Sequence, residues 1–240
     1  MQAMIFAAGK GTRLKPLTDV IPKALVPVGD IPLIQRVMQN IVDAGATRVV
    51  VNIHHHAPQL ENYLSLLRLK YPSVEILISD ESRELLDTGG GIKQARALFD
   101  TVSPTPVLIH NCDILSNVNL REFYSQAKGD ATLLVSERKT QRYLCFDDDM
   151  RLVGWTNIAT GEVKGTRTDR LYAFSGIHVM SPSLMERMDS WPDIFPIMDF
   201  YLRECATADI RGYLKTDLEL LDVGKTDTLE KATAFLMHNA

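Results

Sequence analysis

Residues 3–18 read AMIFAAGKGTRLKPLT, an apolar run that passes directly into a loop with two glycines. The run from Ala3 to Ala8 has the length and composition of a buried strand. Gly9 and Gly11 have no Cβ, so the backbone N–H groups of this loop can approach phosphate oxygens closely. Three cations follow within the same loop, at Lys10, Arg13 and Lys15. By spacing alone, the stretch favours a strand followed by a phosphate-binding loop over a plain turn.

Two other phosphate-binding motifs do not match this loop. A dinucleotide fingerprint would place a third glycine at position 14, where the chain has Leu14, and this argues against a nicotinamide oxidoreductase. A P-loop would need four residues between its first glycine and a Gly-Lys-Ser or Gly-Lys-Thr run, and that pattern is also absent.

Strand and helix patterns alternate along the first half of the chain. Apolar residues from Ile34 to Val42 follow helical spacing, which predicts a helix capped by Asp30 and stopped by Gly45. The same half contains further predicted strands at 49–53, 74–79 and 107–110, and helices at 58–69 and around 92–98. Such alternation indicates a parallel sheet covered on both faces by right-handed crossovers.

The second half changes character. Short strand-like runs at 143–146, 152–156 and 174–180 are separated by turn residues, so antiparallel pairing is expected there. A strand is predicted at 217–223, and a closing helix through Leu229 and Leu236 would be opened by Asp227 and Glu230 as a capping pair. The fold class is therefore α/β and Rossmann-like. It has a mostly parallel sheet, helices on both faces and a small antiparallel insertion, within one domain over residues 1–240.

Composition excludes several classes of protein. With a net charge of −4 and no basic stripe, the chain does not look like a nucleic-acid binder. Cys112, Cys145 and Cys205 are odd in number and far apart, which argues against a disulfide framework and fits a reducing cytoplasm. No apolar stretch approaches the roughly 18 residues that span a bilayer, so no membrane partner is expected. The oligomeric state is left open.

One longer motif carries a family resemblance. The pattern G-x-G-T-R-x-x-P-L-T followed by P-K runs from Gly9 to Lys23 and resembles the signature of the sugar nucleotidyltransferases. The resemblance implies an enzyme with a nucleotide-binding half over 1–115 and a sugar-binding half over 116–240. It also implies that the loop from Ala8 wraps the triphosphate, with nucleotide contacts at Ala8, Gly9, Gly11, Thr12, Arg13 and Lys23.

Two aspartates at predicted strand ends are candidate metal ligands. Asp113 follows the apolar run 107–109, and Asp222 follows another apolar run. Ligands of open α/β sheets bind at such ends, and one or two carboxylates with substrate phosphates are the usual ligands of Mg²⁺. Spacing alone leaves both as ordinary strand-end residues, but the resemblance implies a Mg²⁺ site. It implies Arg13, Lys23 and Asp113 as catalytic residues, with no protein nucleophile, because a sugar phosphate supplies its own anionic oxygen.

Further residues are assigned to the base and to the sugar. Thr88, Gly89 and Gly90 open a predicted helix and resemble a segment that approaches the ribose or base. Asn111 and Gly176 match sugar-facing positions of the family. Lys164 stands where many relatives have a Glu-Lys-Pro segment, although the local sequence departs from that pattern.

Within the family, the chain is most similar to bacterial N-acetylmuramate α-1-phosphate uridylyltransferases. The predicted substrates are therefore UTP and N-acetylmuramic acid α-1-phosphate, which implies a place in nucleotide-sugar biosynthesis and peptidoglycan recycling. The alternatives are a mannose- or heptose-1-phosphate guanylyltransferase, or a non-catalytic sugar-nucleotide-binding subunit. The lactyl carboxylate of the muramate needs a cation or backbone donors beyond those serving the triphosphate. The candidates are Arg138, Lys139, Arg142, Lys164, Arg167 and Arg170.

Three conspicuous features are given ordinary interpretations. His54, His55 and His56 are consecutive and cannot all converge on one ion, so they are interpreted as a strand-to-helix loop near the ligand cleft. The acidic run 147–149 is interpreted as a hairpin turn, and Cys112 as a buried packing residue.

Overall fold

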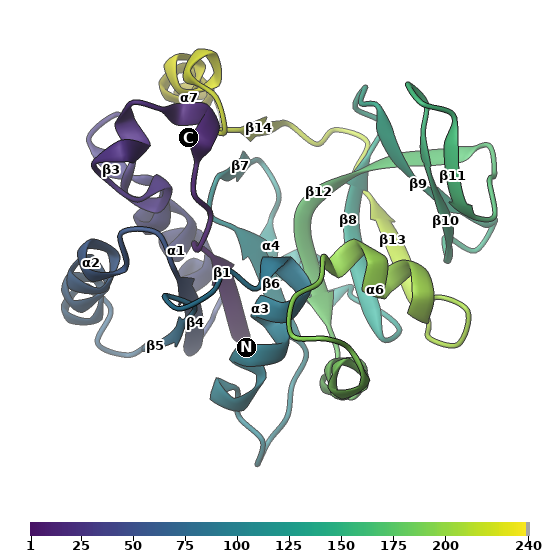
Figure 1. Cartoon of the computed structure of the whole chain (residues 1–240), viewed down its shortest axis with the longest axis horizontal. Helices are drawn as coiled ribbons and strands as arrows, with labels where there is room; N and C mark the ends of the chain where they lie inside the picture. The colour runs from purple at the N-terminus through teal and green to yellow at the C-terminus, as the bar shows by residue number, and fades with distance from the viewer. Residues whose placement is uncertain (239–240) are drawn as a thin grey trace.

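The apolar run that opens the chain forms β1 (Gln2–Phe6), a central strand of a mixed sheet (Figure 1). The computed structural model describes residues 1–238. β1 pairs in parallel with both of its neighbours, and a third parallel pair extends the sheet. These neighbours are β4 (Arg48–Ile53), β5 (Glu75–Asp80) and β6 (Val107–Asn111). All four parallel strands therefore end at the same edge of the sheet, as the alternation of patterns predicted.

The sheet continues with one long strand of opposite direction. β12 (Arg170–Met180) pairs with β6 and with β8 (Ala131–Ser136), antiparallel to both, and β13 (Ile210–Leu214) pairs in parallel with β8. The order is β13-β8-β12-β6-β1-β4-β5. The predicted α/β class with a mostly parallel sheet is confirmed. The sequence pattern did not identify β8 or β13.

An antiparallel ribbon is attached to the first residues of β12. It consists of β9 (Arg142–Phe146), β10 (Leu152–Asn157) and β11 (Glu162–Gly165), with β9 paired to residues 170–172. Figure 1 shows this ribbon at the right of the molecule. β12 thus belongs both to the ribbon and to the main sheet. Its pairing register shifts between Phe174 and His178, around Gly176, whose φ is +77°.

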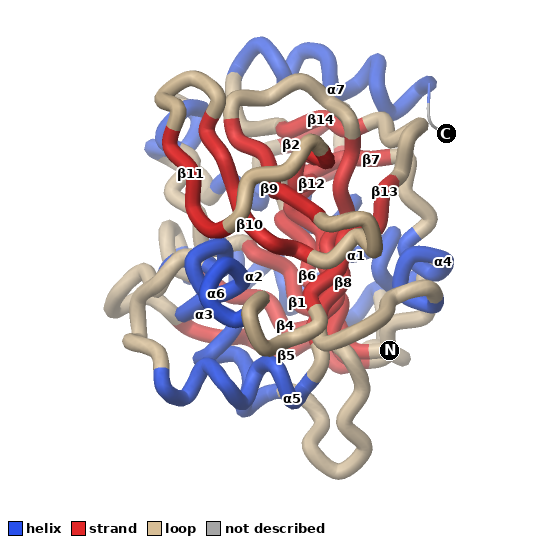
Figure 2. Tube along the Cα trace, turned by 90° about the vertical axis from the view of Figure 1, so that its right-hand side faces the viewer, coloured by secondary structure: helices blue, strands red, loops and turns tan. Residues whose placement is uncertain are grey.

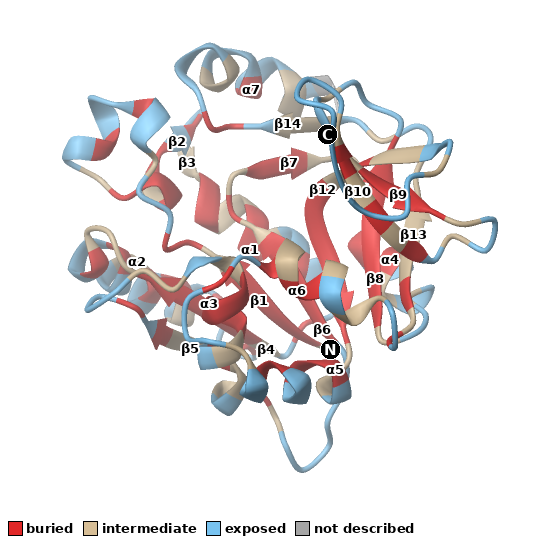
Figure 3. Cartoon of the chain, turned by 45° about the vertical axis from the view of Figure 1, so that its right-hand side comes forward, coloured by how far each residue is buried: buried red, intermediate tan, exposed pale blue. Residues whose placement is uncertain are grey.

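Helices cover both faces of the sheet because successive strand residues point to opposite sides. Ala3 and Ile5 pack on one face, which is covered by α1 (Leu33–Asp43), α2 (Ala57–Lys70) and α4 (Leu120–Ser125). Met4 packs on the other face, which is covered by α3 (Asp87–Ala95), α5 (Pro182–Glu186) and α6 (Ile197–Glu204). Figure 3 shows the resulting band of buried residues along the central strands.

The last described elements lie above the edge where the parallel strands finish. β7 (Ile114–Ser116) follows β6 and pairs with β14 (Leu220–Asp222), and α7 (Thr226–His238) packs over a small third core. Figure 2 shows α7 across the top of the molecule, with the strands at the centre. Within residues 1–238, no helix combines the length and the apolar composition needed to cross a bilayer.

Two predicted helix caps are wrong. Asp30 does not cap α1, because β2 (Pro27–Val28) and β3 (Ile31–Pro32) pair around Gly29 and place Asp30 in their turn. The helix begins only at Leu33, with no side-chain cap. Likewise, α7 already begins at Thr226, so Asp227 lies inside its first turn. There the Thr228 hydroxyl accepts from the Lys225 N–H and donates to its carbonyl.

Candidate active site

A cavity of about 530 Å³ lies at the edge where the parallel strands end. The ends of β1 and β6 contribute to its floor, and the loop after β1 forms one wall. The predicted residues that line it are Ala8, Gly9, Gly11, Thr12, Arg13, Lys23, Thr88, Asn111 and Asp113. Residues separated by more than 100 positions in the sequence therefore meet in one cavity, because parallel strands bring their ends together.

The loop after β1 presents a row of unused backbone donors. Within residues 1–238, the N–H groups of residues 9–13 donate to no other group of the chain. Gly11 turns the loop with a φ of +61°, and its carbonyl accepts from the buried Thr18 hydroxyl at 2.8 Å. A Cβ on Gly11 would stand 2.8 Å from Thr18 Cγ2. Successive N–H groups around such a turn form a concave site for anions.

Two ion pairs join Arg13 and Lys23, which follow β1, to the carboxylates. Lys23 is 9% exposed and pairs with the carboxylate of Asp113. Arg13 Nη2 lies 3.8 Å from Asp222 Oδ2. The two aspartates come from neighbouring strand ends, since Asp222 is the register partner of Ile114 and the Val223 N–H donates to the Asp113 carbonyl at 2.8 Å.

This carboxylate pair fits a hard divalent cation. Asp113 lines the cavity, whereas Asp222 is not among its lining residues but pairs with Arg13, which does line it. Mg²⁺ is usually held by one or two carboxylates together with substrate phosphates. Among residues 1–238 no group of three His, Cys, Asp or Glu side chains forms a closed metal site. A site completed by substrate oxygens does not require such a group.

Asn111 and Gly176 meet beside the cavity. Gly176 has a φ of +77°, and a Cβ there would stand 2.6 Å from Asn111 Nδ2. The glycine therefore leaves room for the Asn111 side chain, which lines the cavity. Gly176 itself is not among the lining residues.

The glycines of α3 serve contacts within the chain. The N–H groups of Gly89 and Gly90 both donate to the Phe195 carbonyl, at 2.8 and 3.2 Å. A Cβ on Gly89 would stand 2.2 Å from the Phe195 ring, and one on Gly90 would stand 2.0 Å from the Asp193 carbonyl oxygen. Thr88 lines the cavity, whereas Gly89 and Gly90 lie behind it.

Lys164 lies in a second, neighbouring pocket of about 380 Å³ between the ribbon and α6. Its ammonium pairs with Asp199 Oδ1 at 3.1 Å and stands over the Trp155 ring, 5.6 Å from the centroid. Arg138 and Arg142 line the same pocket. Burial lowers the pKa of Arg138, and nearby Asp222 opposes that shift, so Arg138 stands between this pocket and the carboxylate pair.

The main cavity is also lined by Asn52 and Glu81, which no sequence motif marked. Both are 2% exposed. Burial raises the pKa of the Glu81 carboxyl, and its hydrogen bonds with Asn52 and Leu86 oppose that shift. A signal was available, since each stands at or just past the end of an apolar strand, as Asn111 does.

The features given ordinary interpretations lie as expected. The three histidines form the loop from β4 to α2, and the acidic run forms the turn between β9 and β10, where Asp147 Oδ1 accepts from two backbone N–H groups. Cys112 is 4% exposed, and burial raises the pKa of its thiol to about 12. A thiol of that kind is protonated and inert at neutral pH.

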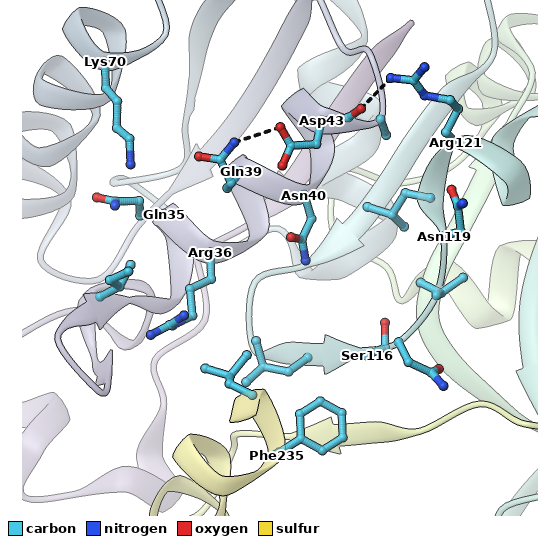
Figure 4. Close-up of a pocket in the computed structure, with 17 residues that line it drawn as sticks. Gln35, Arg36, Gln39, Asn40, Asp43, Lys70, Ser116, Asn119, Arg121 and Phe235 are labelled. Carbon is cyan, nitrogen blue, oxygen red and sulfur yellow. Dashed lines mark hydrogen bonds between the residues drawn. The ribbon is translucent and has the colours of Figure 1, made fainter. Parts of the chain in front are cut away.

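A larger cavity of about 570 Å³ lies elsewhere, between α1, β7, α4 and α7 (Figure 4). It contains none of the predicted site residues. Several of its polar groups are already bonded to one another, as when Arg121 donates to the Asp43 carbonyl and Gln39 to the Asp43 carboxylate. The cavity at the strand ends is therefore the better candidate for chemistry.

Comparisons with known proteins agree with this geometry. N-acetylmuramate alpha-1-phosphate uridylyltransferase of Neisseria meningitidis serogroup B is 30% identical over 98% of this chain and 97% of its own length. The Caulobacter vibrioides protein of the same description is 43% identical over 46% of this chain and 45% of its length. The mannose-1-phosphate guanylyltransferase catalytic subunit beta of Drosophila pseudoobscura pseudoobscura is 28% identical over 88% of this chain. The chain spans 57% of that relative, so it matches about half the length of these last two proteins.

The fold is shared with solved structures. HddC of Yersinia pseudotuberculosis superposes with a TM-score of 0.75, at 23% identity, over 98% of this chain and 99% of that protein. The model of the nucleotidyl transferase family matches residues 2–143, which include β1, the phosphate loop and the Asp113 strand end. The chain belongs to the nucleotidyl transferase family.

Proposed function

We propose that the chain transfers a nucleotidyl group from a nucleoside triphosphate to a sugar 1-phosphate, releasing pyrophosphate. One observation carries this proposal. A row of free N–H donors and two cations, Arg13 and Lys23, stands directly opposite two carboxylates at the strand ends. A non-catalytic binding subunit would have no need of the carboxylate pair.

The reaction requires no nucleophile from the protein. An oxygen of the sugar phosphate attacks the α-phosphorus, a new P–O bond forms there, and the bond to the β-phosphate oxygen breaks. Pentavalent phosphorus and the departing pyrophosphate both carry concentrated negative charge. In this proposal the loop N–H groups and Arg13 bind the triphosphate oxygens, and Lys23 neutralises charge beside the reacting phosphorus.

Asp113 and Asp222 hold Mg²⁺ in this proposal. When bound, the ion supplies neutralisation between two anions that otherwise repel each other. The two carboxylates would hold the ion, and Lys23 and Arg13, which pair with them, would supply positive charge to the phosphates.

The acceptor is proposed to be N-acetylmuramic acid α-1-phosphate, with UTP as the donor. Support comes from the relatives described as muramate uridylyltransferases and from the pocket beside the carboxylates. Of the six cations that the sequence offers, three line that pocket: Arg138, Arg142 and Lys164. Within residues 1–238 the Arg142 guanidinium has no hydrogen-bond or ion-pair partner, which leaves it free for a carboxylate. The three free cysteines favour a cytoplasmic setting.

A matched acceptor pair tests this assignment. N-acetylglucosamine 1-phosphate differs from the muramate only in lacking the lactyl ether. Pyrophosphate release should give a higher kcat/KM for the muramate by about 10- to 100-fold, the scale of an unmatched polar group. Arg142→Ala should remove most of this preference while leaving turnover of the glucosamine phosphate unchanged.

The alternative is a guanylyltransferase for mannose or heptose 1-phosphate. The Drosophila pseudoobscura pseudoobscura relative described as a mannose-1-phosphate guanylyltransferase subunit, which matches 88% of the chain, supports the mannose form. Crossing UTP, GTP, CTP and dTTP with these acceptors distinguishes the two. A higher kcat/KM for GTP with mannose or heptose 1-phosphate would overturn the muramate assignment. It would leave the nucleotidyl transfer itself in place.

A further inference from the structure

The carboxyl end of β4 is bonded to the start of the phosphate loop. Asn52, the penultimate residue of β4, is 2% exposed. Its Oδ1 accepts from the N–H groups of Ala7 and Ala8, at 2.7 and 3.3 Å. These two donors are thereby used inside the protein, and the unused donors begin at Gly9. One side-chain oxygen therefore marks where the strand ends and the anion-binding turn begins.

The same side chain reaches the opposite wall of the cavity. Asn52 Nδ2 donates to Glu81 Oε1 at 2.8 Å, and Glu81 Oε2 accepts from the Leu86 N–H at 3.1 Å. Gly91 leaves space for this pair, since a Cβ there would stand 2.9 Å from Glu81 Oε1. Both oxygens of the buried carboxylate are thus used, and the segment before Asp87 and Thr88 is fixed relative to the phosphate loop.

The histidines that follow Asn52 extend these connections. His54 Nδ1 donates to the Glu81 carbonyl at 2.7 Å, and His55 Nε2 donates to the Thr18 carbonyl at 2.9 Å. Thr18 in turn bonds the Gly11 carbonyl. Residues 52–55 therefore bond to three segments around the cavity, which are residues 7–8, Thr18 and Glu81. These segments are not adjacent to one another in the sequence.

We propose that Asn52, held by Glu81, is a positioning residue that sets the phosphate loop in its triphosphate-binding shape before nucleotide arrives. This inference rests on the proposed function, because it concerns the same loop. An anion site made of backbone N–H groups binds well only if those groups already converge, since ordering them on binding lowers affinity. Both polar atoms of Asn52 make hydrogen bonds within the chain, so its effect on binding is expected to pass through the loop.

Reversing the polarity of the pair provides a sharp test. In Asn52→Asp, two carboxylates face each other, although the new side chain still accepts from Ala7 and Ala8. In Glu81→Gln, the amide can satisfy either Asn52 or the Leu86 N–H, but not both. In the double variant, the new amide at position 81 would donate to the new carboxylate at position 52 and accept from the Leu86 N–H. Every hydrogen bond of the pair is then restored, with donor and acceptor exchanged.

Binding of UTP and of a non-hydrolysable UTP analogue, with Mg²⁺, should be measured by calorimetry for all four proteins. Each single variant should bind about tenfold more weakly, and the double variant should return to within about threefold of wild type. In steady-state assays the KM for the nucleotide should rise in the single variants while the KM for the sugar phosphate stays constant.

Thr132→Val is a matched control. Thr132 is 4% exposed and its hydroxyl makes two bonds to the Lys128 backbone, far from the loop in sequence and on β8. This variant should lose thermal stability without losing nucleotide affinity. Single variants that bind UTP as wild type does, or a double variant weaker than both singles, would overturn the inference. A wild-type protein that binds none of the four nucleoside triphosphates would instead overturn the proposed function.

Discussion

Three charged pairs surround the candidate site before any substrate is present. They are Lys23 with Asp113, Arg13 with Asp222, and Lys164 with Asp199. The first is the most buried, with side chains 11% and 20% exposed. Removing one member of such a pair leaves the other charge without its partner. A substitution of any of these residues therefore also disturbs its charged partner, and the effects of two substitutions within one pair are not expected to be additive.

The carboxylates should be needed for turnover rather than for folding. Asp113→Ala and Asp222→Ala are each expected to lower kcat by on the order of 100-fold, the scale for removing one key stabilising group. Steady-state rates of pyrophosphate release, compared in Mg²⁺ and after removal of the metal by EDTA, would measure this. Full activity in excess EDTA, or wild-type kcat in both variants, would contradict the metal assignment.

Gly11 is the residue at which the loop tolerates least change. Gly11→Ala adds a Cβ 2.8 Å from Thr18 Cγ2 and 3.0 Å from Lys23 Cβ, at a φ that disfavours a side chain. The affinity for nucleoside triphosphate should fall by at least about tenfold, because both the turn and Lys23 must move. Equilibrium binding measures this directly.

Gly161→Ala is the control for Gly11→Ala. Gly161 also has a positive φ, +75°, but nothing lies within 4 Å of its added Cβ, and it stands in the turn before β11. It should show the cost of backbone strain without any loss of affinity. Equal affinity losses in the two variants would refute the crowding argument.

At the scale of elements, β12 connects the parallel strands with the antiparallel ribbon, and α6 packs against β12. His178 of β12 and Tyr201 of α6 are both buried and form a hydrogen bond of 2.6 Å. α6 also carries Asp199, the partner of Lys164. The position of the second pocket therefore depends on a polar contact inside the core.

This contact should make stability depend on pH. Burial lowers the pKa of His178 to about 3, below its ordinary value of 6.5, so the folded state keeps the ring neutral while the unfolded chain binds a proton. The stabilisation is present above pH 6.5 and is lost as the pH falls toward 3. Between pH 6.5 and 5 the loss should be roughly 2 kcal/mol, at about 1.4 kcal/mol per pH unit.

Urea unfolding of wild type and of His178→Gln at pH 7 and pH 5 would measure the effect. Gln keeps a polar side chain but does not titrate in this range. The variant should lose less stability on acidification than the wild type does. The same loss in both proteins would show that His178 does not contribute to the pH dependence.

At the scale of the whole molecule, the cavity is built from segments spread over most of the chain. Lining residues extend from Phe6 to Gly224. A ligand that contacts all of these segments binds the folded state and not the unfolded chain, so its binding free energy adds to stability. If residues 1–240 form one domain, as proposed, the nucleotide-binding and sugar-binding halves should unfold in a single transition, and ligand binding should stabilise both.

Nucleotide with Mg²⁺ should therefore raise the melting temperature. At a concentration about 100 times its Kd, a ligand adds about 2.7 kcal/mol, which for a chain of 150–250 residues corresponds to roughly 5–10 °C. Thermal unfolding with each of the four triphosphates, with and without EDTA, would measure this. UTP should give the largest shift, and no shift with any nucleotide would contradict the proposed site.

Much of the fold and part of the site were determined by the sequence itself. The run from Ala3 to Ala8 and the glycines after it predicted a strand and an anion-binding loop, because apolar periodicity and the absence of a Cβ are local properties. The positions of Asp113 and Lys23 followed from the strand-end rule and the family signature. Two strands of the antiparallel ribbon, β9 and β10, were also predicted, since short strand-like runs separated by turn residues are visible without any tertiary contact, whereas β11 was not.

Only the tertiary structure decided which residues share the cavity and what each one touches. Asn52 and Glu81 have no motif, and their importance comes from hydrogen bonds between segments 29 and 45 residues apart. From the sequence alone, three of the six candidate cations could not be told from the rest: Arg138, Arg142 and Lys164. In the structure these three line one pocket between the ribbon and α6. The N–H groups of Gly89 and Gly90 likewise donate to the carbonyl of Phe195, which is more than 100 residues away in the sequence. Sequence periodicity reports the environment of one element at a time, whereas a site is a set of distances between elements, and those distances exist only once the chain has packed.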